Sequence, residues 1–185
     1  MRKRLPFIVR FTLVTSLVAA LSGLLVLRGI SYRISGYRHF QHPLDQHYIS
    51  ALETQFRDEY GANATPDNLR NFTLKHTASS LHFMLKSSSL RDPNRILARG
   101  GAHCTMYSVV LSTLYNQLAR EMRWNATCRV AIGQVHLFGV NLHQFASSPF
   151  FASHDFCVIR DVNRVQAVDA VAFDYIGVPG VRLRP

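Results

Sequence analysis

The chain has 185 residues, of which 48% are hydrophobic, and its 21 Lys and Arg residues against 11 Asp and Glu give a formal net charge of +10. This length fits one domain with at most a short appendage and excludes a multidomain enzyme. The hydrophobic content is typical of a globular protein and excludes a disordered chain, while the 3 widely spaced cysteines exclude a disulfide mini-protein and a four-cysteine zinc site.

The positive charge is concentrated at the N-terminus. Residues 1–40 contain seven basic and no acidic side chains, whereas the remaining 145 residues contain 14 basic and 11 acidic ones. The body of the chain has neither a basic stripe with interleaved aromatic residues nor a phosphate-binding GxxxxGK loop. We therefore expect no nucleic-acid partner.

An uncharged stretch near the N-terminus predicts a membrane segment. Residues 11–27, FTLVTSLVAALSGLLVL, lie between two groups of basic residues. A helix that extends to Ile30, with Arg28 reaching the headgroups, has the length of about 20 residues that a bilayer core of about 30 Å requires. We predict a basic flank over 1–10 and a transmembrane signal anchor over 11–30. A cleaved signal peptide is the alternative, but the apolar run continues past the small-residue triplet at residues 20–22.

The basic flanks also predict the orientation of this segment. Four basic side chains precede it and three follow it before residue 40, so the positive-inside rule narrowly favours a cytoplasmic N-terminus. The lipid bilayer is then a partner of the chain through its N-terminal helix. Residues 31–43 are polar and aromatic, which predicts a linker to an extracytoplasmic body over 44–185.

The first half of the body has the spacing of helices. Apolar residues recur at helical intervals, Thr65, Pro66 and Asp67 form a helix-start signal, and Gly100 and Gly101 form a turn. The predicted helices cover residues 43–60, 65–86, 94–99 and 104–122.

The second half changes to a strand pattern. Three segments rich in β-branched residues, 128–133, 155–161 and 164–171, are separated by turn signals, and a long connection is expected over 134–153. Together the two halves predict an α+β fold with helices packed on a small antiparallel sheet.

Three residues in this arrangement have the chemistry of an acyl-transfer site. Cys104 stands where the glycine turn enters a helix, and the positive end of the helix dipole favours its thiolate and supplies backbone N–H groups for an oxyanion. His154 stands at the start of the second predicted strand. Asp169 lies 15 residues later in the third, where it can accept a hydrogen bond from the imidazole. The order predicts a nucleophile, a base and an orienting residue.

Other residues compete for these roles. His103 is disfavoured as the base because adjacent side chains diverge on a helix. Asp174 is the fallback for Asp169, and His143 is the reserve candidate for a pocket residue. The nine histidines are scattered, without HExxH or paired cysteine spacing, so we expect no metal and no cofactor.

The segments RGGAHCTMYSVVLSTLYNQL, ASHDFCVIRD and QAVDAVAFDYIG resemble the cysteine, histidine and aspartate segments of the transglutaminase-like superfamily, which is related to papain. The resemblance implies a transglutaminase-like fold and assigns Cys104 as nucleophile, His154 as general base and acid, and Asp169 as orienting residue. It departs from the family at Ala102, where a glycine is common two positions before the cysteine, and at Phe156, where a tryptophan is common.

The resemblance leaves two functions open. The family includes peptidases, amidases and transglutaminases, so the first expectation is a membrane-anchored thiol hydrolase or acyltransferase that acts on a protein or peptide. The alternative is an inactive member of the same fold that serves as an anchored binding or assembly module.

The two remaining cysteines fall on strands that are expected to pair. Cys128 and Cys157 would face away from His154, because side chains alternate along a strand. In an oxidising compartment a disulfide between them would leave Cys104 as the free thiol.

Overall fold

The computed structural model describes residues 28–40, 42–85, 90–145, 152–162 and 164–184. The predicted basic flank and residues 11–27 of the predicted membrane segment lie outside these ranges. Among the described residues no helix is both long and apolar enough to cross a bilayer.

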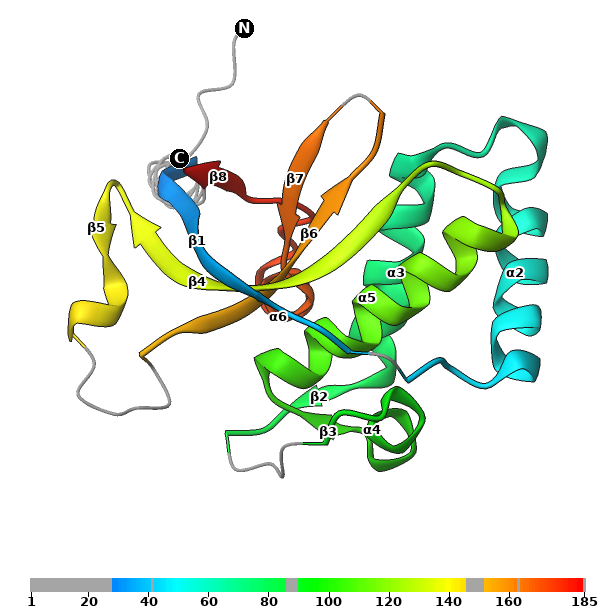
Figure 1. The fold of residues 1–185 in the computed structure, drawn as a ribbon, viewed down its shortest axis with the longest axis horizontal. Coiled ribbons are helices and arrows are strands. Elements are labelled where there is room, and N and C mark those ends of the chain that lie inside the picture. The colour runs from blue at the N-terminus through cyan, green and yellow to red at the C-terminus, as the bar shows by residue number, and fades with distance from the viewer. Residues whose placement is uncertain (1–27, 41, 86–89, 146–151, 163, 185) are drawn as a thin grey trace, which may run out of the picture.

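A mixed sheet forms one half of the molecule (Figure 1). Its strands follow the order β7-β6-β4-β1-β8, and a short strand, β5, pairs with β4. The neighbours on this path are antiparallel except β1 and β8, which are parallel, so the expected antiparallel sheet has one parallel edge pair. The bounds are β1 (Ile30–Arg38), β4 (Thr127–Leu137), β5 (Val140–Asn141), β6 (His154–Arg160), β7 (Val165–Val168) and β8 (Arg182–Arg184).

Helices form the other half, and α5 runs between the sheet and the outer helices α2 and α3 (Figure 1). A separate parallel pair of short strands, β2 (His82–Phe83) and β3 (Gly101–Ala102), lies next to α4. The α+β class is therefore confirmed. The helices are α2 (Gln46–Tyr60), α3 (Pro66–Ser80), α4 (Pro93–Arg99), α5 (Cys104–Glu121) and α6 (Ala170–Ile176), with 3₁₀ turns η1 (Gly61–Asn63) and η2 (Leu142–Phe145).

Two apolar clusters hold these layers together. The larger lies between the helices and one face of the sheet, and α5 is at its centre because most of its side chains are buried. The smaller lies on the opposite face and includes Tyr32 and Phe156. The alternation along β6 explains this division: Cys157 and Ile159 belong to the larger cluster, whereas Phe156 and Val158 belong to the smaller one.

The segment expected as a linker over 31–43 instead provides strand β1. Ile30, Tyr32 and Ile34 alternate with polar residues, which is the period of a half-buried strand. The strand pairs along its length with β4, from Ile30 opposite Leu137 to Arg38 opposite Val130. The polar residues of β1 made it look like a linker in the sequence. Its backbone hydrogen bonds are formed with β4, about 100 residues further along the chain, so no local pattern reveals them.

Two expectations for the second half are also corrected. The strand predicted over 164–171 ends at Val168, because the Asp169 carboxylate caps a helix that begins at Ala170. The long connection predicted from Gln134 is shorter, because β4 continues to Leu137.

The expected Cys128–Cys157 disulfide is absent, since all three cysteines carry free thiols. Cys128 pairs with Ile159 and Cys157 pairs with Val130, so the two cysteines stand diagonally across the ladder. Diagonal positions have Cα atoms about 7–8 Å apart, which exceeds the usual disulfide range of about 4.4–6.8 Å. The two thiols nevertheless lie close enough to form a hydrogen bond.

This register predicts that both thiols stay free in purified protein that has never been reduced. Alkylation under denaturing, non-reducing conditions followed by peptide mapping should label both Cys128 and Cys157. A pre-reduced sample serves as the reference for complete labelling. Recovery of a peptide pair cross-linked between these two cysteines would contradict the diagonal register.

Candidate active site

Cys104 is the first residue of α5, and two glycines bring the chain to this point. Gly100 ends α4 with φ of 73°, a left-handed conformation that suits glycine. Gly101 is buried in β3, where an added Cβ atom would force the Met84 side chain to move. Ala102, which follows, is accommodated in β3 with no exposed surface.

The other two predicted residues meet at the ends of neighbouring strands. His154 begins β6, and its Nε2 lies 2.6 Å from Oδ2 of Asp169, the residue that follows β7. The second carboxylate oxygen, Oδ1, accepts hydrogen bonds from the backbone N–H groups of Val171 (2.9 Å) and Ala172 (3.1 Å) at the start of α6. The helix start thus fixes the carboxylate that holds the imidazole.

Tyr32 completes the support of this carboxylate from β1. Its hydroxyl donates a hydrogen bond of 2.5 Å to Oδ2 of Asp169. Its ring meets the His154 ring edge-on at a centroid distance of 5.7 Å, and Phe156 stacks near His154 at 6.3 Å. Phe156 therefore provides an aromatic wall beside the imidazole.

The electrostatics of the site favour an ion pair between Cys104 and His154. Burial alone would raise the pKa of Cys104, but hydrogen bonds from the rings of His103 and His154, the charge of His154 and a hydrogen bond from the Asp155 backbone N–H lower this pKa to about 6. Burial alone would lower the pKa of His154, but the charge and hydrogen bond of Asp169, with a further contribution from Cys104, raise it to about 10. At neutral pH the pair is thiolate and imidazolium.

The Asp169 carboxylate, the third member of the site, stays ionised. Burial disfavours its charge, yet the positive charge and hydrogen bond of His154, the Tyr32 hydroxyl and the Ala172 N–H lower the pKa of Asp169 below its usual value. Because Asp169 engages Nε2 of His154, the imidazole presents Nδ1 to the Cys104 sulfur, with which it forms a hydrogen bond. The three predicted residues are therefore brought together.

His103 takes a larger part than its sequence position suggested. It is the N-cap residue of α5 with an extended backbone (φ −103°, ψ 178°), so the divergence expected of adjacent helical residues does not apply to it. Its ring forms a hydrogen bond with the Cys104 sulfur that helps to lower the pKa of this thiol. The premise that adjacent side chains diverge was therefore wrong for His103, and the choice of His154 over His103 as the base stays a prediction.

Asp155 joins the start of α5 to the start of β6. Its carboxylate is almost fully buried and accepts hydrogen bonds from the Thr105 hydroxyl and from Nε of Arg38, which lies 3.1 and 3.0 Å from the two oxygens. Its backbone N–H acts on the Cys104 sulfur. Asp155 thus links the two segments of the site, because it directly follows His154 and binds Thr105, which directly follows Cys104.

The first turn of α5 keeps its backbone N–H groups free of a side-chain cap. Helices α2, α3, α4 and α6 begin with capping side chains, Asp45, Thr65, Asp92 and Asp169 respectively. His103 makes no such bond at the start of α5. These N–H groups, at the positive end of an 18-residue helix beside a thiolate, are suited to bind an oxyanion.

The remaining sequence candidates lie in other surroundings. Asp174 accepts a hydrogen bond of 2.9 Å from the Tyr107 hydroxyl and does not replace Asp169. His143 lies in η2, after β5, and His136 is buried in β4. Within the described ranges no three His, Cys, Asp or Glu side chains gather in a way that could hold a metal ion.

Four residues of the site were not identified from the sequence. Tyr32 and Arg38 belong to β1, far from the rest of the site along the chain, and no local pattern marks them. Asp155 and Thr105 directly follow His154 and Cys104, and this adjacency is the one signal that could have drawn attention to them.

Comparison with known proteins adds no assignment. No family model matches the sequence, and no curated protein matches it at a significant level.

Proposed function

We propose that this chain is a thiol-dependent hydrolase or acyltransferase of the transglutaminase-like kind, acting through Cys104, His154 and Asp169. The observation that carries the proposal is the meeting of these side chains at the ends of α5, β6 and β7, with Nε2 of His154 held 2.6 Å from Asp169. The lowered pKa of Cys104, to about 6, gives the nucleophile in its reactive form at neutral pH.

The reaction follows from this arrangement in two steps. The Cys104 thiolate attacks an amide or ester carbonyl, and the resulting oxyanion is stabilised by backbone N–H groups at the start of α5. The His154 imidazolium gives its proton to the leaving amine or alcohol, which leaves a thioester on Cys104. Neutral His154 then removes a proton from water or an amine, which attacks the thioester and releases the thiolate. Water makes the protein a hydrolase, and an amine makes it a transferase.

We further propose that the chain works at a membrane on a protein or peptide. The uncharged segment 11–27 with basic flanks supports a bilayer anchor, and the charge difference across it supports an extracytoplasmic body. Strand β1 begins at Ile30, so an anchor must end before this residue rather than at it as predicted. The site would therefore be reached by substrates near the bilayer surface.

The test uses p-nitrophenyl acetate, an activated ester, with the full-length chain in detergent. We expect rapid release of p-nitrophenolate and an acetyl group on the peptide that contains Cys104, identified by mass spectrometry. Because the sulfur is the attacking atom, Cys104→Ala should abolish both signals.

Cys128→Ala is the matched control, since it removes a buried thiol outside the site and should acylate like the native chain. If the folded native protein is not acetylated at Cys104, the proposal fails. The inactive binding or assembly module would then be the better description of this fold.

A further inference from the structure

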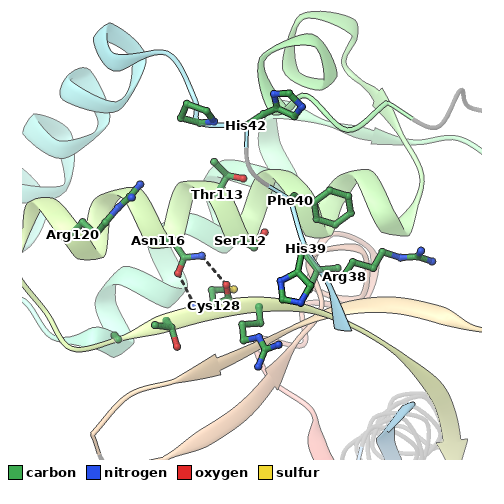
Figure 2. A pocket seen from close by; sticks show the side chains of 14 residues that line it. Arg38, His39, Phe40, His42, Ser112, Thr113, Asn116, Arg120 and Cys128 are labelled. Carbon is green, nitrogen blue, oxygen red and sulfur yellow. Dashed lines mark hydrogen bonds between the residues drawn. The ribbon is translucent and has the colours of Figure 1, made fainter. Parts of the chain in front are cut away.

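Two adjoining cavities lie beside α5. The larger, of about 730 Å³, is bounded by the middle of α5, by β4 and by the segment that follows β1 (Figure 2). The smaller, of about 400 Å³, includes Thr105, the residue next to Cys104. Both are lined by Arg38, His39 and Phe40, so they meet along this segment.

One wall of the larger cavity is held in place by paired hydrogen bonds. The side-chain amide of Asn116 on α5 donates to the backbone oxygen of Cys128 and accepts from its backbone N–H, both at 2.7 Å (Figure 2). The helix and strand therefore keep their separation without a ligand. A volume of this size is within the usual range for a binding site of about 300–1,000 Å³.

The lining of both cavities is basic. It contains four arginines and two histidines and, among the described residues, no Asp or Glu. Arg38 is neutralised by Asp155. Arg129 lies over the Tyr37 ring at 4.0 Å. Because Cys128 and Val130 on either side of it face the helices, the Arg129 side chain lies on the opposite face of the sheet. Arg91 and Arg120 form no ion pair with any described residue. Two arginine charges thus lie at the cavities without an acidic partner among the described residues.

We propose that these cavities bind an acidic peptide segment of the substrate, whose carboxylates pair with Arg91 and Arg120. Arginine suits this role because its planar group presents several N–H donors to a carboxylate. The apolar side chains in the lining, which include Phe40 and Ile132, provide contacts for the rest of the segment. The inference rests on the proposed function in one respect only, that the bound peptide leads to Cys104.

The length of α5 predicts how far the acidic residues of the substrate peptide lie from the carbonyl that Cys104 attacks. Thr105 and Arg120 are 15 residues apart on this helix, a rise of about 22 Å at about 1.5 Å per residue. An extended peptide covers this distance with about six or seven residues. The substrate should therefore carry acidic residues within about seven positions of the carbonyl that Cys104 attacks.

The binding test is independent of catalysis because it uses the Cys104→Ala chain, full-length in detergent. Fluorescein-labelled octapeptides of glutamate, glutamine and lysine are titrated, and binding is followed by fluorescence anisotropy at low and moderate salt. We expect the glutamate peptide alone to bind, with an affinity that falls as salt rises. The double variant with Arg91 and Arg120 changed to Gln should weaken binding at least about tenfold.

Arg182→Gln is the matched control. Arg182 is exposed on β8, is outside the lining of both cavities and forms no ion pair with a described residue. Equal binding of the glutamate and glutamine peptides, or equal losses in the double variant and in the control, would overturn the inference. Acetylation of Cys104 by p-nitrophenyl acetate would still stand in that case, so failure of the peptide site is distinguishable from failure of the proposed reaction.

Discussion

Replacement of Asp169 by Asn should lower the steady-state hydrolysis of p-nitrophenyl acetate by about 10²- to 10⁴-fold. Nε2 of His154 donates to Oδ2 of Asp169 in the native site. An Asn amide group at that position would instead donate to Nε2, which places the remaining imidazole proton on Nδ1. A ring in this tautomer cannot take a proton from the water that attacks the thioester.

The same substitution should leave the fold intact. Asn is as good a helix cap as Asp, so Oδ1 of the variant can still accept from Val171 and Ala172 at the start of α6. Thermal unfolding of the variant checks this. Asp174→Asn, the same change in a carboxylate that faces Tyr107, should hydrolyse the ester within a few-fold of the native rate. A comparable rate in Asp169→Asn would refute the orienting role.

Alkylation of Cys104 by iodoacetamide should rise with pH through an inflection at about 6. The sign follows from the thiolate being the nucleophile. Below this pH the sulfur is protonated and unreactive, and above it the hydrogen bonds of the two histidines and the charge of His154 keep it ionised. Cys128 and Cys157 are buried and should not contribute to the rate in the folded chain. Mass spectrometry of the labelled peptide gives the rate for Cys104 alone at each pH.

Loss of His154 tests the cause of this inflection. In His154→Ala the cationic neighbour is removed, so the inflection should move upward by about 1–3 pH units. His47→Ala is the matched control, because His47 is exposed on α2. In this variant the inflection of Cys104 alkylation should stay at the native value. An inflection in the native chain at the value of a free thiol would contradict the thiolate–imidazolium pair.

The sequence was sufficient where the signals are local. Thr65, Pro66 and Asp67 predict the start of α3. The helix predicted from Cys104 to residue 122 agrees with α5, which ends at Glu121. The glycine pair before Cys104 and the first residue of β6 could also be recognised, because turns and strand patterns depend on near neighbours. These local signals explain why the sequence could single out three residues that the structure brings together.

Long-range pairing decided the rest. Segment 31–43 looked like a linker, but its backbone completes the sheet as β1, and this strand brings Tyr32 to Asp169 across a separation of 137 residues. The helix that starts at Ala170 was hidden in a strand pattern, because the Asp169 cap outweighs the β-branched residues around it.

By itself the sequence determined the fold class, the starts of α3 and α5 and the order of cysteine, histidine and aspartate, since each depends on residues close together in the chain. Its basic excess, most of it before residue 40, gave no information about a substrate. Only the tertiary structure brought Tyr32 to Asp169, joined Asp155 to Arg38 and Thr105, and gathered arginines around the cavities. Those features arise where β1, β4, β6 and α5 meet, and the contacts between segments so far apart have no counterpart in local sequence.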